Sequence, residues 1–288
     1  MKKWLETLEQ VNFTRGCSDK TIIVAISFLL MICACAYAED AQINTAFFHH
    51  LKSQKTLLSF PTDPLEYRIL KEYGAFWVNS DEAVLLPQTL IFEDRKATES
   101  YQKRLELEPV PGFSSCLLQK SALKALKQAQ AERKLTPRGT DSCLRDYITT
   151  EKLWLSRVNP NLAYYVSIGK LSQKEADRIR ALSPKNQVSE ILKLEEKGLL
   201  FDKYRQTSIL NSVAAPGSSQ HLSGLAFDLS QYADPKARTT MNKYGWYQTV
   251  LNDLPHFTYL GKLTEKELRD AGLKKVVSQG YSFWVPNL

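Results

Sequence analysis

Long apolar runs, internal repeats and low-complexity tracts are scarce in this chain of 288 residues. Apolar residues make up 43% and charged residues 24% of the sequence, which is ordinary for a globular protein and excludes a collagen-like, coiled-coil or disordered chain. The length is enough for one large domain or two small ones. Only residues 21–38 form an extended, uncharged and mostly apolar stretch.

This N-terminal stretch has the order of a secretory signal. Basic residues precede it, and it closes on Ala36 and Ala38, a pair of small residues around Tyr37. We therefore predict that residues 1–38 are an export signal and that the protein works in the periplasm or cell envelope. A retained membrane anchor at residues 21–38 remains open as an alternative, because about 18 residues can just span a bilayer. Lipidation at Cys35 is a further alternative.

Cysteine is scarce outside this signal. The chain has five cysteines, and Cys17, Cys33 and Cys35 belong to residues 1–38. Cys116 and Cys143 remain, and an even count in an oxidising compartment predicts a disulfide between them. Two cysteines without a nearby histidine pair do not predict a metal site.

Acidic residues are outnumbered, and the net charge is +7. A modestly basic exported protein suits an anionic partner such as a cell wall, a membrane surface or a polyanion, and charge alone does not choose among these. We expect no nucleic-acid partner.

The order of elements predicts an α+β fold. Helical patterns are expected at residues 45–52, 115–134, 146–157, 170–182 and 187–198, with capping boxes at Ser172 and Thr264. Short strands are expected within residues 74–92, 224–230 and 256–261, and a linker at residues 109–112. The expected architecture is a small, mainly antiparallel sheet with helices packed on one side, preceded by an N-terminal subdomain at residues 39–112 whose role is unknown.

Histidine is the rarest chemistry-bearing residue, with four in the whole chain. His49 and His50 lie in an apolar helical pattern and are interpreted as surface or packing residues. His221 lies before the strand that carries Asp228, and His256 opens the next candidate strand. Two histidines and one aspartate match a catalytic zinc site, which needs three protein ligands and an open position.

A second carboxylate lies close to this set. A zinc ion activates water and polarises a carbonyl, so a peptidase also needs a base that does not bind the metal. Asp253 is the acidic residue nearest to His256 in the sequence and takes that role in our interpretation. From the residues alone, the alternative that these four side chains are ordinary structural groups stays open.

The segment from Ser219 to Asp228 resembles the S-x-H-x-x-G-x-A-x-D motif of the VanY-like zinc D-alanyl-D-alanine carboxypeptidases, which belong to the LAS metallopeptidase superfamily. The segment from Asp253 to Phe257 is similar to the second metal segment of that family. The resemblance implies one Zn²⁺ per chain, held by His221, Asp228 and His256, with Asp253 as the catalytic acid and base. Ser219, the first residue of the motif, would contact substrate.

A third element of the family is a strand with the pattern S-x-x-R, which Ser142 and Arg145 match. The resemblance implies that Arg145 binds a substrate carboxylate through a bidentate guanidinium. A surface arginine beside Asp141 or Asp146 is the alternative. The likeness covers about residues 113–288, and the long gap between Arg145 and His221 implies a helical insertion at about residues 157–205.

The resemblance therefore implies hydrolysis of peptidoglycan stem peptides, most simply by a D-alanyl-D-alanine carboxypeptidase. Asp253 and Pro255 stand where that family has Glu and Trp, and the D-x-P-H form looks more like the L-alanyl-D-glutamate endopeptidase branch. An endopeptidase is thus an alternative. A non-catalytic, zinc-containing wall-binding domain is the alternative outside the enzymes.

Overall fold

The computed structural model describes residues 45–53 and 63–288, so the predicted signal or anchor at residues 1–38 lies outside the described part. The described residues form one unit. None of the helices described in it is long and apolar enough to cross a membrane. The α+β fold class is confirmed.

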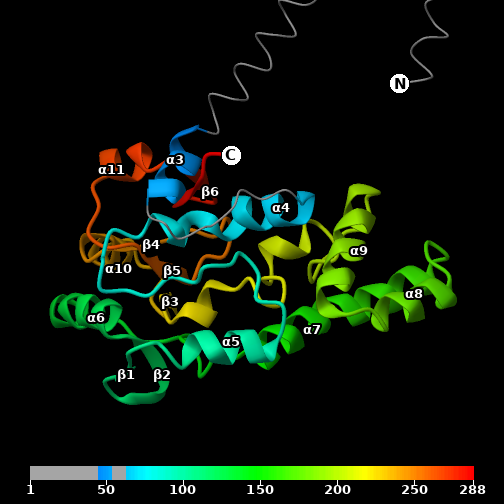
Figure 1. The fold of residues 1–288 in the computed structure, drawn as a ribbon, viewed down its shortest axis with the longest axis horizontal. Helices are drawn as coiled ribbons and strands as arrows, with labels where there is room; N and C mark the ends of the chain where they lie inside the picture. The colour runs from blue at the N-terminus through cyan, green and yellow to red at the C-terminus, as the bar shows by residue number, and fades with distance from the viewer. Residues whose placement is uncertain (1–44, 54–62) are drawn as a thin grey trace, which may run out of the picture. The chain divides into compact units, whose positions relative to one another are not determined.

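In the described part of the chain, the strands form three separate antiparallel sheets instead of one (Figure 1). The central sheet has the order β3-β5-β4, and the other two are hairpins. The bounds are β1 Leu107–Val110, β2 Phe113–Gln119, β3 Ala226–Asp228, β4 Trp246–Tyr247, β5 His256–Tyr259, β6 Leu273–Ser278 and β7 Tyr281–Pro286.

Most of the predicted helices are present. Ser172 and Thr264 both form the predicted capping boxes, with Glu175 and Glu267 as their partners. The bounds are α3 Thr45–Ser53, α4 Pro64–Tyr73, α5 Arg95–Gln102, α6 Lys120–Glu132, α7 Tyr147–Ser167, α8 Gln173–Arg180, α9 Pro184–Glu196, α10 Pro235–Lys243 and α11 Glu265–Asp270, with short 3₁₀ helices η1 Gly74–Val78, η2 Ile209–Asn211 and η3 Gln220–Ser223.

The helix predicted from residue 115 begins only at Lys120. Residues 113–119 form β2, which pairs with β1 across a turn at Pro111 and Gly112. The residues predicted as a linker are therefore a hairpin turn, and Gly112 adopts φ +80°, which a glycine tolerates without strain. Cys116 and Leu118 are both buried from the same face of β2, a period of two that a helical interpretation of the segment overlooks.

The strands predicted within residues 74–92 are absent. Gly74–Val78 continues directly from α4 as η1, and all five of its residues are buried. Residues 79–92 contain turns and bends but no strand. A short run that is apolar throughout shows no periodicity, so it cannot distinguish a buried strand from a buried helical turn.

Two hydrophobic clusters make up most of the core. The first surrounds the central sheet and includes Phe227, Trp246 and Phe257, together with residues of α3, η1 and α6. The second lies around α7, α8 and α9 and includes Trp154 and Phe201, together with residues of α4. Figure 1 shows α8 and α9 beside α7, the region for which an insertion is predicted. The described segments before residue 113 thus share both clusters with the later part of the chain.

Candidate metal centre and its cavity

Pairing of β3 with β5 brings two distant parts of the chain together. The two strands are antiparallel, and Asp228 lies directly opposite His256 in their register. His221 comes from η3, which ends at Ser223 and is capped by Gly224, two residues before β3 begins at Ala226. Gly224 has φ +67°, and a Cβ there would lie 3.3 Å from the backbone nitrogen of Gln119, so this sharp turn requires glycine.

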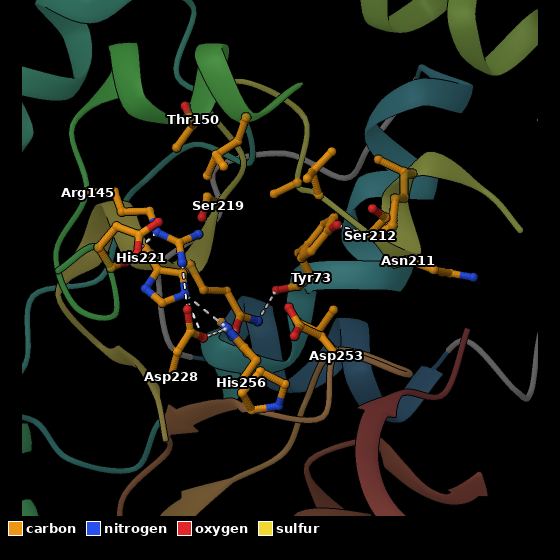
Figure 2. Close-up of a pocket in the computed structure, with 18 of the residues that line it drawn as sticks. Tyr73, Arg145, Thr150, Asn211, Ser212, Ser219, His221, Asp228, Asp253 and His256 are labelled. Atoms are coloured by element: carbon orange, nitrogen blue, oxygen red, sulfur yellow. Dashed lines mark hydrogen bonds and ion pairs between the residues drawn. The ribbon is translucent and has the colours of Figure 1, made fainter. Parts of the chain in front are cut away.

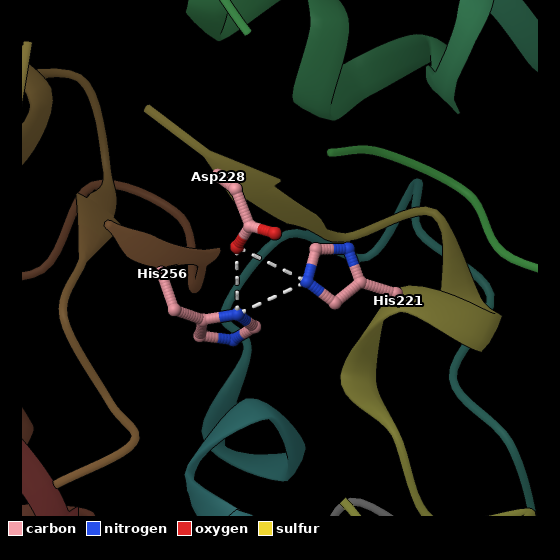
Figure 3. A group of neighbouring side chains, drawn as sticks. All are labelled: His221, Asp228 and His256. Atoms are coloured by element: carbon pink, nitrogen blue, oxygen red, sulfur yellow. Dashed lines mark hydrogen bonds and ion pairs between the residues drawn. The ribbon is translucent and has the colours of Figure 1, made fainter. Parts of the chain in front are cut away.

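His221, Asp228 and His256 form a compact group that could hold a metal ion (Figure 3). Their donor atoms all lie within 4.8 Å of one another. Asp228 Oδ1 is 3.2 Å from His221 Nε2 and 3.3 Å from His256 Nδ1, and the two nitrogens are 3.1 Å apart. The three predicted ligands are thus brought together, with both imidazoles buried.

The hydrogen bonds on the far side of each ring fix its tautomer. His221 Nδ1 is 2.7 Å from the carbonyl oxygen of Cys143, which can only accept, so Nδ1 carries a proton. His256 Nε2 is 2.8 Å from Gln220 Oε1. Gln220 Nε2 donates to the carbonyl of Tyr73 at 2.8 Å, so the amide oxygen must face His256. Both remaining ring nitrogens therefore turn lone pairs toward Asp228.

Three electron-pair donors so close together require a proton or a cation between them. Burial, and then the positive charge of Arg145, lower the pKa of His221 to about 4, so a proton on this ring is disfavoured at neutral pH. Burial alone would raise the pKa of Asp228, but His221 and His256 hold it well below its usual range. Neutral imidazoles and an ionised carboxylate are the states that bind zinc, and the donor set fits that ion.

Arg145 joins this group, although not from the predicted strand. It lies in the loop before α7, so the prediction of a strand at this position is wrong. A contact with a distant segment holds this loop in place: the backbone N–H of Arg145 donates to the carbonyl of His221 at 3.2 Å. Its Nη2 donates to Asp228 Oδ2 at 2.6 Å, and its Nε donates to the carbonyl of Asp141 at 2.7 Å. Arg145 therefore lies beside Asp141, as the alternative expects, but its guanidinium also contacts the predicted ligand Asp228.

Asp253 lies at the edge of the same group without belonging to it. It is in the turn that leads into β5, and the N–H of His256 donates to its carbonyl at 3.2 Å. Figure 2 shows its side chain between Tyr73 and His256. No hydrogen bond or ion pair between described residues engages its carboxylate, and burial raises its pKa, with His256 acting in the opposite sense.

A cavity of about 190 Å³ connects these residues. His221, Asp228, His256, Asp253, Arg145 and Ser219 all line it, so every predicted catalytic, metal-binding or substrate-binding residue reaches one space (Figure 2). Ser219 is buried at its wall. The other walls come from one face of α7 and from residues 210–214.

Several lining residues were not predicted from the sequence. Gln220 sits inside the motif, between Ser219 and His221, and its position beside a ligand could have drawn attention to it. Arg157 follows Thr150 and Leu153 at helical spacing, which could have indicated a common face. Tyr73 and Arg138 carry no sequence signal, because they reach the cavity only through tertiary packing.

The predicted disulfide is confirmed, and it supports the centre. Cys116 of β2 is bonded to Cys143, whose carbonyl accepts from His221. The bridge therefore attaches the loop of Cys143 and Arg145 to the β1–β2 hairpin.

Comparisons with known proteins give little further information. No family model matches the chain, and no curated protein matches it. One solved structure is similar, that of the LdcB LD-carboxypeptidase, described as revealing the molecular basis of peptidoglycan recognition. It has 16% sequence identity and a TM-score of 0.33, and the match covers 75% of this chain and 90% of the other. A superposition this distant carries no argument about function.

Proposed function

We propose that the protein is a metal-dependent peptidase, with His221, Asp228 and His256 as ligands of one Zn²⁺ and Asp253 as the catalytic base. One observation carries the proposal: two imidazoles with fixed tautomers and a carboxylate converge, and a second carboxylate, which no described residue binds, faces the same cavity. A structural metal site alone would need no such extra group. This separates the proposal from a non-catalytic wall-binding domain.

A bound zinc ion would supply Lewis-acid activation of a peptide carbonyl and of an attacking water. Proton transfer is the role of a side chain of the protein, Asp253. Asp253 accepts the proton that the water loses as its oxygen bonds to the carbonyl carbon, and then delivers that proton to the leaving amine as the C–N bond breaks. Burial raises the pKa of Asp253 toward the operating pH, at which one group can both accept a proton and give it back.

Peptidoglycan stem peptides are the proposed substrates. The proposal rests on the motif resemblance at residues 219–228 and 253–257, together with an export signal predicted at residues 1–38. The location outside the cytoplasmic membrane is part of the same proposal.

The test compares Asp253→Asn with the unchanged protein. The amide cannot accept a proton, so turnover of muropeptides should fall about 10²–10⁴-fold, while zinc content stays at one ion per chain. His256→Ala is the matched variant, and it should lose both metal and activity. Metal analysis and mass spectrometry of the digested muropeptides provide the two readouts. Near-normal turnover by Asp253→Asn would rule out its role as base.

The role of Arg145 distinguishes a carboxypeptidase from an endopeptidase. A carboxypeptidase must recognise a terminal carboxylate, which a guanidinium binds well. In the structure Arg145 already contacts Asp228, and this contact favours the endopeptidase as a second candidate. If the enzyme is a carboxypeptidase, a peptide with an amidated C-terminus should be cleaved about 30-fold or more slowly than the acid, and Arg145→Ala should abolish that difference. Equal cleavage of acid and amide by the unchanged protein would favour the endopeptidase.

A further inference from the structure

The cavity has a second basic end that the proposed chemistry does not use. Arg157 lines it from α7, on the same face as Thr150 and Leu153. Its Nε donates to Ser212 Oγ at 3.0 Å and its Nη1 donates to Ser156 Oγ at 2.9 Å. Both partners are neutral hydroxyls. No ion pair between residues of the described part includes Arg157, whereas Arg145 is paired with Asp228.

The segment that supplies Ser212, residues 208–212, is held in place by polar contacts. Glu195, which is buried, accepts from the backbone N–H of Ile209 at 2.7 Å and from Ser208 Oγ at 2.6 Å. The hydroxyl of Tyr73 donates to the carbonyl of Leu210. These contacts fix the segment that leads into Ser212. The guanidinium is therefore oriented before any ligand arrives, which lowers the entropic cost of binding.

The charges of the cavity favour an anionic ligand once a divalent ion is bound at the metal centre. Three arginines (138, 145 and 157) and three aspartates (141, 228 and 253) line it, so their charges cancel. A divalent ion at the metal centre would leave an excess of two positive charges. A peptide with more than one carboxylate matches that excess.

The length of α7 between its start and Arg157 gives an estimate of how far this basic end lies from the metal centre. Residue 157 lies ten residues along α7 from its start beside the Arg145 loop, or about 15 Å at the α-helical rise. Helical side chains lean toward the N-terminus, which shortens the distance. An extended peptide spans about 3.4 Å per residue, so the interval corresponds to about three or four residues.

We infer that Arg157 and Ser212 form a subsite for a second carboxylate of the substrate, about three or four residues from the scissile bond. The inference rests on the proposed function for its peptide substrate. It assigns to this face of α7 the selection of acidic peptides, whereas the metal centre performs the cleavage.

The test uses two peptides that differ only by Glu or Gln at the third or fourth residue from the scissile bond. Binding to the full-length protein in chelator is measured by calorimetry, and kcat/KM is measured with zinc. The unchanged protein should prefer the Glu peptide about tenfold or more in both assays, as expected for a charged hydrogen bond. Arg157→Gln should abolish the preference, Arg157→Lys should keep part of it, and Ser212→Ala should reduce it. Arg95→Gln, on α5 and outside the cavity lining, is the matched control and should keep all of it.

The two proposals fail in different ways. Loss of hydrolysis for both peptides, with Arg157-dependent binding of the Glu peptide intact, would overturn the peptidase and leave the subsite. A preference that is absent in the unchanged protein, or that persists in Arg157→Gln, would overturn the subsite whatever the hydrolysis shows.

Discussion

At the scale of single residues, the centre depends on groups that never touch the reacting atoms. Gln220 Oε1 lies 2.8 Å from His256 Nε2 and also accepts from Thr258 Oγ1 at 2.5 Å. Its amide nitrogen donates to the carbonyl of Tyr73, which lies 147 positions earlier in the sequence, and this contact orients the amide. One neutral side chain thus sets which nitrogen of His256 is available to a metal, in the way that outer hydrogen bonds orient metal ligands in general.

We predict that Gln220→Leu will bind zinc about 10–100-fold more weakly, because the ring of His256 loses the acceptor that fixes its tautomer. Competition with a chromophoric chelator measures the affinity directly. Gln187→Leu is the matched control: Gln187 is also buried and accepts from Trp154 Nε1 at 3.0 Å, but within the α7–α9 cluster. It should lower stability without changing zinc affinity. An equal loss of affinity in both variants would mean that Gln220 acts only through folding.

At the scale of elements, the sequence predicted the helices with polar signals better than the buried segments. Capping boxes at Ser172 and Thr264 were predicted correctly, because a cap is a local hydrogen-bonding pattern between residues three apart. η1 and β2 were predicted wrongly, because burial of η1 throughout removes its periodicity and β2 runs directly into a true helix. Local patterns cannot reveal which neighbour buries a segment.

The same limit applies to the site. His221, Asp228, His256 and Asp253 were predicted together because they belong to two short motif segments, and the structure gathers all four around one cavity. Arg145 was predicted near the site but in a strand, because the loop around it is set by the disulfide and by His221. Gln220, Tyr73 and Arg157 contribute through contacts between distant segments, which no local spacing encodes.

The Cys116–Cys143 disulfide should contribute both to the stability of the fold and to zinc binding. Cys116→Ser with Cys143→Ser should lower the free energy of unfolding by roughly 3–4 kcal/mol, because the bridge closes a loop with a sequence separation of 27. It should also weaken zinc binding, because the loop it anchors supplies the carbonyl that accepts from His221. Denaturant unfolding and zinc titration of the double variant measure the two effects. A stability loss with unchanged zinc affinity would show that the loop holds its position without the bridge.

At the scale of the whole molecule, the candidate metal centre lies where the two hydrophobic clusters meet. Leu210 and Ala215 belong to the α7–α9 cluster, whereas Leu225 and Phe227, a few residues later, belong to the cluster around the central sheet. The segment that contains His221 therefore passes from one cluster to the other. Metal binding there should stabilise both clusters together, by about 2.7 kcal/mol when free zinc is 100 times the dissociation constant.

This arrangement predicts how stability depends on pH. In chelator, the unfolded chain holds a proton on His221 below about pH 6.5, but the folded chain does so only below about 4. Stability should therefore be lost as the pH falls from about 6.5 to 4, by about 3 kcal/mol in total. The lowered pKa of Asp228 acts in the same direction at still lower pH, and the raised pKa of Asp253 opposes this loss just above pH 3.8.

Thermal unfolding in chelator measures this effect. The melting temperature should fall steeply as the pH is lowered from about 6.5 to 4, and this fall should be much smaller in His221→Gln. With zinc present, the melting temperature should fall still more steeply with decreasing pH, because protons then also displace the metal. His221→Gln should lose this effect of zinc. An equal fall in melting temperature in the unchanged protein and in His221→Gln would show that protonation of His221 does not link the centre to the stability of the fold.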